Sequence, residues 1–164
     1  MKPLLVALAG NPNAGKTSLF NAITGSKQHV GNWPGKTIAK KEGNFQYKGH
    51  DLNIVDLPGT YSLSAFSPEE VIARDFIVQE KPDVVVTVLD AANLERNLYL
   101  AVQVLEMEVP VVVALNMADI AESKHIQIER ATLSRALKVP VVRTVARKEE
   151  GIRELLDAII ETAQ

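Results

Sequence analysis

The chain has 164 residues, of which 46% are hydrophobic and 23% charged, a composition ordinary for one soluble globular domain. Its formal net charge of -2 argues against a nucleic-acid or membrane-surface binder, because such proteins normally carry a basic excess. Since cysteine is absent, disulfides, thiolate catalysis and thiolate metal sites are excluded, and the composition fits a reducing compartment such as the cytoplasm.

Four short apolar runs, at residues 4–9, 52–55, 84–89 and 111–115, predict the main strands. Their apolarity is continuous rather than alternating, which indicates strands buried on both faces, as in a parallel sheet. Each run is far shorter than the roughly 20 apolar residues of a membrane span. The first run leads directly into Gly10 rather than into a small-residue cleavage site, so we interpret it as a strand and not as a signal peptide.

Helical patterns lie between these runs. One begins directly after the glycine-rich turn at residues 10–15. Another begins at Ser67, a residue type that caps helices, with Pro68 at the first helical position and acidic residues after it. The helices are expected at residues 17–24, from 68 onward, and at residues 94–107, 127–137 and 151–162.

Residues 38–47 and 52–56 flank a turn at residues 48–50, which predicts a β-hairpin, and residues 139–142 predict one further short strand. The expected fold is therefore α/β, with a six-stranded, mostly parallel sheet, one antiparallel edge strand and helices on both faces. No repeat, low-complexity tract or linker divides the sequence, so residues 1–164 are expected to form a single domain.

Residues 10–17 match the pattern G-x-x-x-x-G-K-[ST] between a predicted strand and a predicted helix. Glycines let backbone N–H groups turn towards a β-phosphate, and the helix N-terminus adds its positive dipole end. Lys16 is expected to reach the β- and γ-phosphates, and the Thr17 hydroxyl to bind Mg²⁺. The alternative is a glycine-rich turn that carries Lys-Thr by chance. The expected phosphate-binding residues are Gly10, Asn11, Pro12, Asn13, Ala14, Gly15, Lys16, Thr17 and Ser18.

Residues 56–59, with the sequence Asp-Leu-Pro-Gly, end the return strand of the predicted hairpin. Asp56 is expected to hold Mg²⁺ through water, and the Gly59 N–H to meet the γ-phosphate, because glycine permits a close approach. Taken alone, D-x-x-G also fits an ordinary turn, but its distance from the phosphate loop and its place at a strand end favour the nucleotide role. Leu57 and Pro58 are therefore also expected to lie at the nucleotide.

Residues 31–37 contain too many turn formers for regular structure and are interpreted as a mobile loop. Thr37 is expected to supply a second magnesium ligand. Thr24 and Thr60 are its rivals, but the first lies in a predicted helix and the second follows the D-x-x-G turn. A loop held through one Thr–Mg²⁺–phosphate bridge is released when the γ-phosphate leaves, as in a molecular switch. The residues of this loop expected at the nucleotide are Gly35, Lys36 and Thr37.

The phosphate loop predicts a nucleoside triphosphate of any kind, whereas Asn116-Met117-Ala118-Asp119, after a predicted strand, predicts guanine. The Asp119 carboxylate can accept hydrogen bonds from guanine N1–H and the exocyclic amine, while adenine would leave it badly paired. A polar loop after a strand is the alternative. Met117 replaces the more usual lysine, so only modest affinity for GTP or GDP is expected. Thr144, Val145 and Ala146 loosely match an element that directs a backbone N–H towards guanine O6.

Residues 10–21, 30–35, 56–63 and 116–119 together resemble the N-terminal G domain of the ferrous iron transport protein B (FeoB) family. The Asn-Trp-Pro-Gly sequence and the Met of the base-reading element are similar to that family rather than to small GTPases generally. The resemblance implies a Ras-like P-loop GTPase fold, in a cytoplasmic G domain that precedes a helical spacer and a polytopic membrane permease for Fe²⁺. It places the parent protein at the cytoplasmic face of the cell membrane, with guanine nucleotide, spacer and permease as partners.

Thr60 stands where many small GTPases have a water-orienting glutamine, and neither switch contains an arginine, so slow unaided hydrolysis is expected. The resemblance implies that K⁺ supplies the missing charge, held by Asn13 and by backbone carbonyls near Gly31 and Trp33. The alternatives are that Asn13 braces its own loop and that Trp33 packs on the protein surface. The expected catalytic residues are Asn13, Lys16, Thr37 and Gly59, and the expected metal ligands are Thr17, Thr37 and Asp56 for Mg²⁺ and Asn13, Gly31 and Trp33 for K⁺.

Other functions stay open at this point. A guanine-nucleotide sensor would bind nucleotide tightly with negligible hydrolysis. A ribosome- or tRNA-associated GTPase would share the Asn-containing phosphate loop but would carry a basic RNA-binding extension that this chain lacks, so nucleic acid is not an expected partner. A P-loop kinase or ATPase is disfavoured by Asp119. A homodimer and a trimer are both compatible with the sequence.

Overall fold

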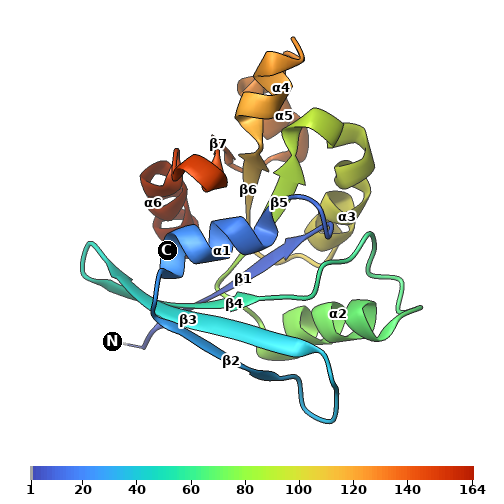
Figure 1. Cartoon of the computed structure of the whole chain (residues 1–164), viewed down its shortest axis with the longest axis vertical. Coiled ribbons are helices and arrows are strands. Elements are labelled where there is room, and N and C mark those ends of the chain that lie inside the picture. Colours follow the sequence, from blue (N-terminus) through green and yellow to red (C-terminus); the bar gives the residue numbers. More distant parts are fainter. Residues whose placement is uncertain (1) are drawn as a thin grey trace.

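Residues 2–164 are described by the computed structural model, and over these residues seven strands form one sheet (Figure 1). The strands are β1 (Leu4–Gly10), β2 (Gln28–Asn32), β3 (Ala39–Tyr47), β4 (His50–Asp56), β5 (Val84–Asp90), β6 (Val111–Asn116) and β7 (Val141–Arg143). Across the sheet they lie in the order β2-β3-β4-β1-β5-β6-β7. The pairs β1–β4, β1–β5, β5–β6 and β6–β7 are parallel, which confirms the expected α/β class with a mostly parallel sheet.

The sheet has one strand more than predicted, and its antiparallel edge consists of two strands. A seventh strand, β2, occupies residues that the sequence analysis assigned partly to an irregular loop, and it pairs antiparallel with β3 from Gln28↔Gly43 to Asn32↔Ala39. Its residues are mostly exposed and carry no apolar run, so the pattern that reveals buried strands is missing there. The one strand that runs against the others, β3, lies between β2 and β4 rather than at the edge.

The helices are α1 (Lys16–Thr24), α2 (Pro68–Glu80), α3 (Leu94–Glu106), α4 (Ala118–Ser123), α5 (Arg130–Leu137) and α6 (Ile152–Ala163), with short 3₁₀ turns η1 (Ala91–Asn93) and η2 (Ala146–Lys148). The cap predicted for α2 is confirmed, because the Ser67 hydroxyl accepts a hydrogen bond from the Glu70 N–H at 3.2 Å. The helix predicted from residue 127 begins later, at Arg130, and the short α4 was not predicted. In the described part of the chain, every helix falls short of the length and apolarity that a bilayer crossing requires.

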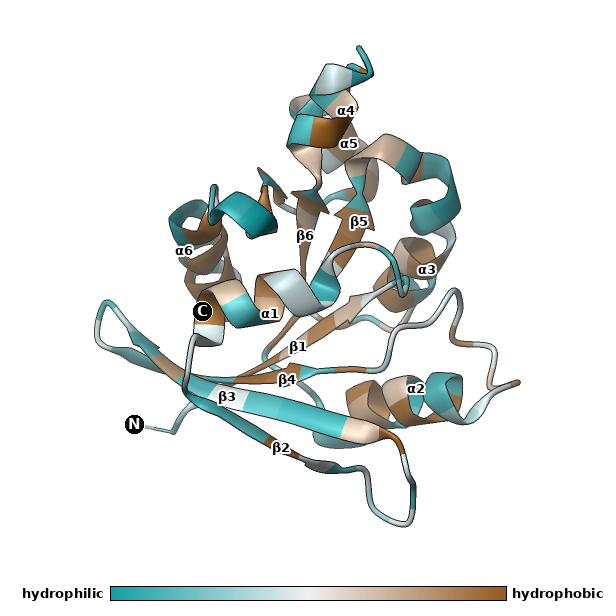
Figure 2. Cartoon of the chain, in the orientation of Figure 1, coloured by the Kyte–Doolittle hydropathy of each residue, from teal (hydrophilic) through white to brown (hydrophobic). Residues whose placement is uncertain are grey.

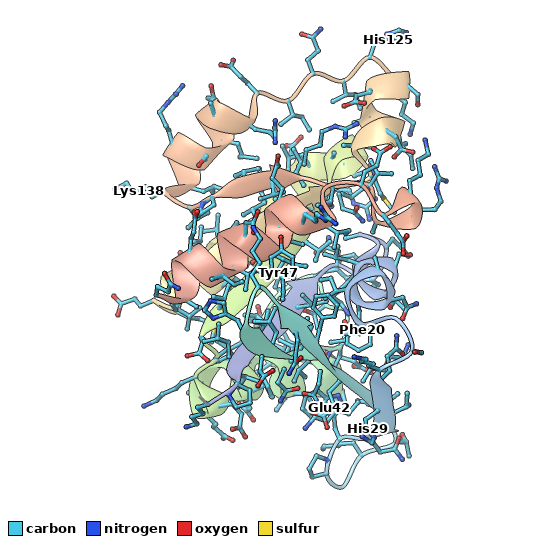
Figure 3. The ribbon with its side chains drawn as sticks, turned by 90° about the vertical axis from the view of Figure 1, so that its left-hand side faces the viewer. Phe20, His29, Glu42, Tyr47, His125 and Lys138 are labelled. Carbon is cyan, nitrogen blue, oxygen red and sulfur yellow. The ribbon has the colours of Figure 1, made fainter. Side chains whose placement is uncertain are left out.

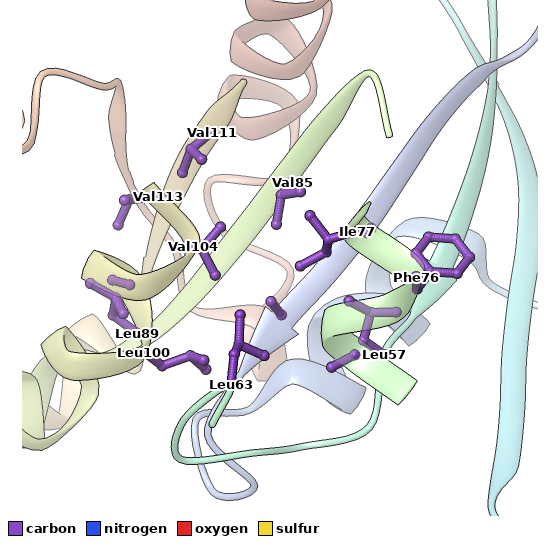
Figure 4. Close-up of a cluster of buried hydrophobic side chains, with 14 of the residues drawn as sticks. Leu57, Leu63, Phe76, Ile77, Val85, Leu89, Leu100, Val104, Val111 and Val113 are labelled. Atoms are coloured by element: carbon purple, nitrogen blue, oxygen red, sulfur yellow. The ribbon is translucent and has the colours of Figure 1, made fainter. Parts of the chain in front are cut away.

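Successive residues of the inner strands face opposite sides of the sheet, which divides the core into two layers. On one side Ala7 and Val85 pack against α2 and α3, in the cluster drawn in Figure 4. On the other side Val6 and Val86 pack against α1 and α6. Figure 2 shows the same division, with hydrophobic inner strands and a largely hydrophilic β3. The helices therefore cover both faces, as predicted, and leave the ends of the strands accessible.

The β3–β4 hairpin is attached to the last helix at its turn. The Tyr47 hydroxyl donates to the Asp157 carboxylate at 3.0 Å, and Lys48 Nζ approaches the same oxygen at 2.8 Å. Figure 3 shows Tyr47 at the side of α6, while His29 and Glu42, cross-strand partners on β2 and β3, lie at the far end of the hairpin. One end of the hairpin is thus held, and the end that carries the loop between β2 and β3 projects from the domain (Figure 1).

Gly43 lies where β3 passes closely over the end of α1. A Cβ atom at this position would come within 2.6 Å of Thr24 Cγ2 and 2.8 Å of the Lys27 carbonyl oxygen. Gly43→Ala is therefore expected to lower the free energy of unfolding, measured by urea denaturation, by about 1–3 kcal/mol, the usual cost of overpacking. Gly31→Ala is the matched control, because a Cβ there meets nothing within 4 Å. Equal stability of the two variants would contradict this packing.

Candidate functional site

The candidate site lies at one edge of the sheet, where the parallel strands β1, β4 and β6 end. The strands end at Gly10, Asp56 and Asn116 respectively, and each is followed by one of the three predicted motifs. Parallel strands direct their carboxyl ends to the same edge, which is where α/β proteins bind ligands. The contacts described below show that the three motifs meet there.

The loop between β1 and α1 has the form of an anion-binding turn. The Ala14 N–H donates to the Asn11 carbonyl at 3.1 Å, and Gly15 precedes the helix with φ of 82°, a conformation that favours glycine. Space alone also demands glycine at this position, because a Cβ on Gly15 would lie 2.3 Å from Asn116 Nδ2. The loop leads directly into the N-terminus of α1, whose free N–H groups and dipole suit a phosphate.

Lys16 and Asp56 form a buried ion pair between the start of α1 and the end of β4. Lys16 Nζ contacts Asp56 Oδ1 and also donates to the Leu57 carbonyl at 2.6 Å. Only 6% of Lys16 and 7% of Asp56 is exposed, so each charge is neutralised mainly by the other. The Thr17 hydroxyl is exposed on the first turn of α1, and a hydroxyl with a carboxylate is the oxygen donor set that Mg²⁺ prefers. The residues present therefore fit a magnesium ion.

The D-x-x-G turn lies directly on the phosphate loop. The Thr60 N–H donates to the Gly10 carbonyl at 3.1 Å, and a Cβ on Gly59 would lie 2.8 Å from Pro12 Cα. Only glycine permits this approach between the two backbones. The structure therefore places the predicted γ-phosphate contact, Gly59, beside the predicted phosphate-binding loop.

Asn116 joins three segments through one buried side chain. Its Nδ2 donates to the Ala14 carbonyl at 3.0 Å, and its Oδ1 accepts from Thr144 Oγ1 and from the Ala146 N–H, each at 3.0 Å. Only 2% of Asn116 is exposed. This side chain fixes the phosphate loop relative to the loop after β7, so the predicted base-reading element and phosphate-binding element have a defined spacing.

The backbone N–H groups of the loop after β7 have partners within the protein. A backbone N–H from Thr144, Val145 or Ala146 was expected to point towards guanine O6. In the structure these N–H groups donate to the carbonyl of Leu115 at 2.9 Å, to the carbonyl of Glu150 at 3.1 Å, and to Asn116 Oδ1, respectively. All three donors are used within the protein, because the segment is tied to its neighbours on both sides.

Asp119 lies in the first turn of α4, at the mouth of a small cavity. The cavity has a volume of about 120 Å³ and is lined by Gly15, Ser18, Asn116, Met117, Asp119, Ile120, Val145, Ala146 and Arg147. Arg147 Nη2 donates to Asp119 Oδ2 at 2.7 Å, and Lys148 Nζ lies 3.6 Å from the same oxygen. Burial raises the pKa of the Asp119 carboxyl, but the Ile120 N–H and the charges of Arg147 and Lys148 outweigh it and hold that pKa below its ordinary value. The carboxylate is therefore ionised and available as an acceptor.

The loop between β2 and β3 packs on α2. It leads into β3, whose start pairs with the end of β4 at Lys41↔Asp56, so it lies at the same end of the sheet as the site, with β3 and β4 between it and β1 (Figure 1). Trp33 is 6% exposed and packs edge-on against Phe76 of α2, with ring centroids 5.7 Å apart. Lys40 Nζ lies over the Trp33 ring, 4.9 Å from its centroid. In this conformation Trp33 is a packed surface anchor, the second of the two interpretations considered for it.

Of the predicted potassium ligands, Asn13 lies in the loop after β1, Gly31 in β2 and Trp33 in the loop after β2. Asn13 is exposed, and within residues 2–164 its side chain forms no hydrogen bond, so it does not brace its own loop. The Trp33 carbonyl instead accepts a hydrogen bond from the Lys36 N–H at 2.9 Å, inside the turn at the end of the hairpin.

The contacts of the Arg147 and Lys148 side chains with Asp119 were not predicted from the sequence. Arg147 and Lys148 belong to η2, directly after the Thr144–Ala146 segment, and their adjacency to that segment was the only available signal. Nor was the contact of Asn11 predicted, which is buried and donates through Nδ2 to the Arg96 carbonyl of α3 at 3.4 Å. Both contacts are made by side chains of loops, which hydrophobic patterning does not report.

Comparison with known proteins identifies relatives over nearly the whole chain. Residues 4–159 match the sequence profile of a family described as ferrous iron transport protein B. The Fe(2+) transporter FeoB of Escherichia coli K12 is 50% identical over 163 residues, which is 97% of this chain and 21% of that protein. A fusion of Fe(2+) transport protein A with FeoB in Porphyromonas gingivalis is 51% identical over 94% of this chain and 18% of that protein. The chain thus spans about a fifth of the length of the curated relatives it matches.

Solved structures agree with the sequence matches. The cytosolic domain of the T. maritima FeoB iron transporter in a GDP form superposes with a TM-score of 0.96 at 50% identity, over 99% of this chain and 64% of that one. The same domain in its GMPPNP form gives a TM-score of 0.95 at 50% identity, over 98% of this chain and 64% of that one. The G domain of T. maritima FeoB gives 0.93 at 49% identity, over 99% of this chain and 100% of that one.

Removal of the Asn116 side chain tests the connection between the loops. Asn116→Ala leaves the Ala14 carbonyl, the Thr144 hydroxyl and the Ala146 N–H without their buried partner. The free energy of unfolding without nucleotide is expected to fall by about 1–3 kcal/mol, the cost of unsatisfied buried polar groups. Asn13→Ala, at an exposed side chain of the same type, is the control and should leave urea denaturation nearly unchanged. A similar small effect of both substitutions would mean that Asn116 does not hold the loops together.

Proposed function

The chain belongs to the ferrous iron transport protein B family, and we propose that it is the guanine-nucleotide-binding, GTP-hydrolysing switch domain of a ferrous iron transporter. One observation carries the proposal: Asn116 ties the phosphate loop to the loop after β7, beside the cavity at Asp119. A phosphate-binding loop and a carboxylate that suits guanine are therefore held at one edge of the sheet. GDP and GMPPNP forms of a relative support nucleotide binding here.

The phosphate groups of GTP would be bound by the loop of residues 10–18. Its backbone N–H groups and the N-terminus of α1 attract the negative charge. The Lys16 ammonium would contact the β- and γ-phosphates in place of the Asp56 carboxylate, because the carboxylate and the phosphates compete for the same cation at short range. Asp56, through water, and the Thr17 hydroxyl would then hold Mg²⁺, which when bound neutralises phosphate charge during transfer. Each of these residues lies within the site described above.

The base would lie in the cavity beside Met117, with its hydrogen-bonding edge on Asp119. Guanine offers two adjacent donors, N1–H and the 2-amino group, to the carboxylate. Adenine offers neither donor there and would leave a partly buried carboxylate without a partner. An unpaired polar group of this kind discriminates strongly between ligands. The proposed preference for GTP over ATP therefore depends on Asp119.

Hydrolysis would require the loop of residues 33–38 to leave its place on α2. Thr37 would then meet the γ-phosphate and Mg²⁺, while the backbone of Gly59 already lies beside the phosphate loop. Thr60 offers no glutamine-like amide, so the unaided rate is expected to be of the order of 10⁻⁴ to 10⁻² s⁻¹. We propose that potassium raises this rate, and the free, exposed side chain of Asn13 supports that part of the proposal.

The remaining assignments concern the parent protein. The curated relatives are Fe(2+) transporters, and the chain matches about a fifth of their length. We propose that the domain lies at the cytoplasmic face of the cell membrane and acts on a helical spacer and a membrane permease domain. Its two nucleotide states would gate these partners through the loop of residues 33–38 and the D-x-x-G turn.

Exchange of one carboxylate for an amide tests the guanine assignment. Asp119→Asn should weaken GDP binding about 10-fold or more, the value of a charge-assisted hydrogen bond, and should create binding of xanthosine diphosphate, whose 2-oxo group accepts from an amide. Affinities are measured by competition of each nucleotide with fluorescent methylanthraniloyl-GDP or its xanthosine counterpart. Asp157→Asn removes a carboxylate on α6, far from the cavity, and should change neither. Unchanged GDP affinity in Asp119→Asn would refute the assignment.

A further inference from the structure

Arg147 occupies the same carboxylate that the proposed base would need. Its Nη2 donates to Asp119 Oδ2 at 2.7 Å, with the Lys148 ammonium 3.6 Å from that oxygen. The Asp119 side chain is 19% exposed, whereas that of Arg147 is 69% exposed. The carboxylate is therefore fixed at the cavity, while the guanidinium reaches it from solvent and can leave without disturbing the core.

The backbone beneath Arg147 is held in place. The Ala146 N–H donates to Asn116 Oδ1 at 3.0 Å, and Val145 and Glu150 exchange two backbone hydrogen bonds of 3.1 Å each. The backbone from which the Arg147 side chain extends is thus held in a defined position beside the cavity. A long side chain on a fixed backbone can alternate between Asp119 and solvent without any movement of the loop.

A guanidinium group and the edge of guanine present the same chemistry to a carboxylate. Each offers adjacent N–H donors in one plane, the geometry that a carboxylate pairs with best. Arg147 donates one hydrogen bond, to Oδ2, and therefore competes with guanine for that oxygen. The cavity has about 120 Å³ of free volume, below the roughly 300–1,000 Å³ typical of ligand pockets, and Arg147 is part of its wall.

We propose that Arg147 is an internal competitor of guanine: its guanidinium holds the Asp119 carboxylate and is displaced when the base is bound. The inference rests on the proposed function, in which Asp119 reads guanine. Arg147 is a specificity-determining residue that lowers affinity for guanine nucleotides and speeds their release, because it takes the carboxylate back as the base leaves. It touches no reacting atom.

Removal of the Arg147 guanidinium should strengthen nucleotide binding, even though it also removes a positive charge near the anionic nucleotide. Arg147→Ala is expected to lower the Kd for methylanthraniloyl-GDP about two- to five-fold, the value of a partly exposed ion pair, with a slower dissociation rate in stopped flow. Arg147→Lys keeps the positive charge and can still reach Asp119, so it should stay close to the wild-type chain.

The Asp119→Asn variant separates competition for the carboxylate from a general effect of the Arg147 charge on nucleotide binding. In Asp119→Asn the carboxylate is absent, so adding Arg147→Ala should leave the Kd for methylanthraniloyl-xanthosine diphosphate unchanged or raise it. Weaker GDP binding in Arg147→Ala, or an equal change in both backgrounds, overturns the competition and makes Arg147 a phosphate attractor or a brace of the loop. If the wild-type chain binds GDP no better than ADP, the proposed function on which the inference rests is wrong. This result differs from those that would overturn only the competition by Arg147.

Discussion

The buried ion pair between Lys16 and Asp56 is the interaction on which the organisation of this site depends. It exists because β1 and β4 are parallel neighbours, so the helix that follows one strand meets the carboxylate that ends the other. Removing one partner of a buried pair typically costs about 3–5 kcal/mol, so neither charge can be left alone. A ligand that takes Lys16 must therefore bring a cation to Asp56. A nucleotide phosphate together with Mg²⁺ meets this requirement, whereas either one alone leaves a charge unpaired.

The same arrangement recurs at the other half of the site. Asp119 is paired with Arg147, and the Asn116 side chain satisfies three polar groups from two segments. The polar groups of the edge thus serve as one another's partners. Binding of the proposed nucleotide would then exchange internal contacts for contacts with the ligand. The net gain in binding free energy would therefore be modest, and the nucleotide would dissociate readily. Such a balance suits a switch, whose two states must lie close in free energy.

Much of this edge could be predicted, because each motif follows a strand that local apolarity reveals, as at Gly10, Asp56 and Asn116. The fold class followed from the same runs. Strand β2 could not be predicted, since its polar, exposed residues are held by pairing with β3 rather than by burial. The position of Trp33 on Phe76 and the pairing of Arg147 with Asp119 depend on distant segments meeting in space, and local sequence patterns contain no such information.

The central claim, that this edge hydrolyses GTP with help from a bound cation, is tested most directly by turnover. Phosphate release from GTP is measured with Mg²⁺ in potassium chloride and in sodium chloride at matched ionic strength, for the wild-type chain and for Asn13→Ala. We expect slow hydrolysis that potassium stimulates and a loss of that stimulation in the variant. Equal, negligible turnover in both salts would contradict this claim and would leave a guanine-nucleotide sensor that depends on an outside activator.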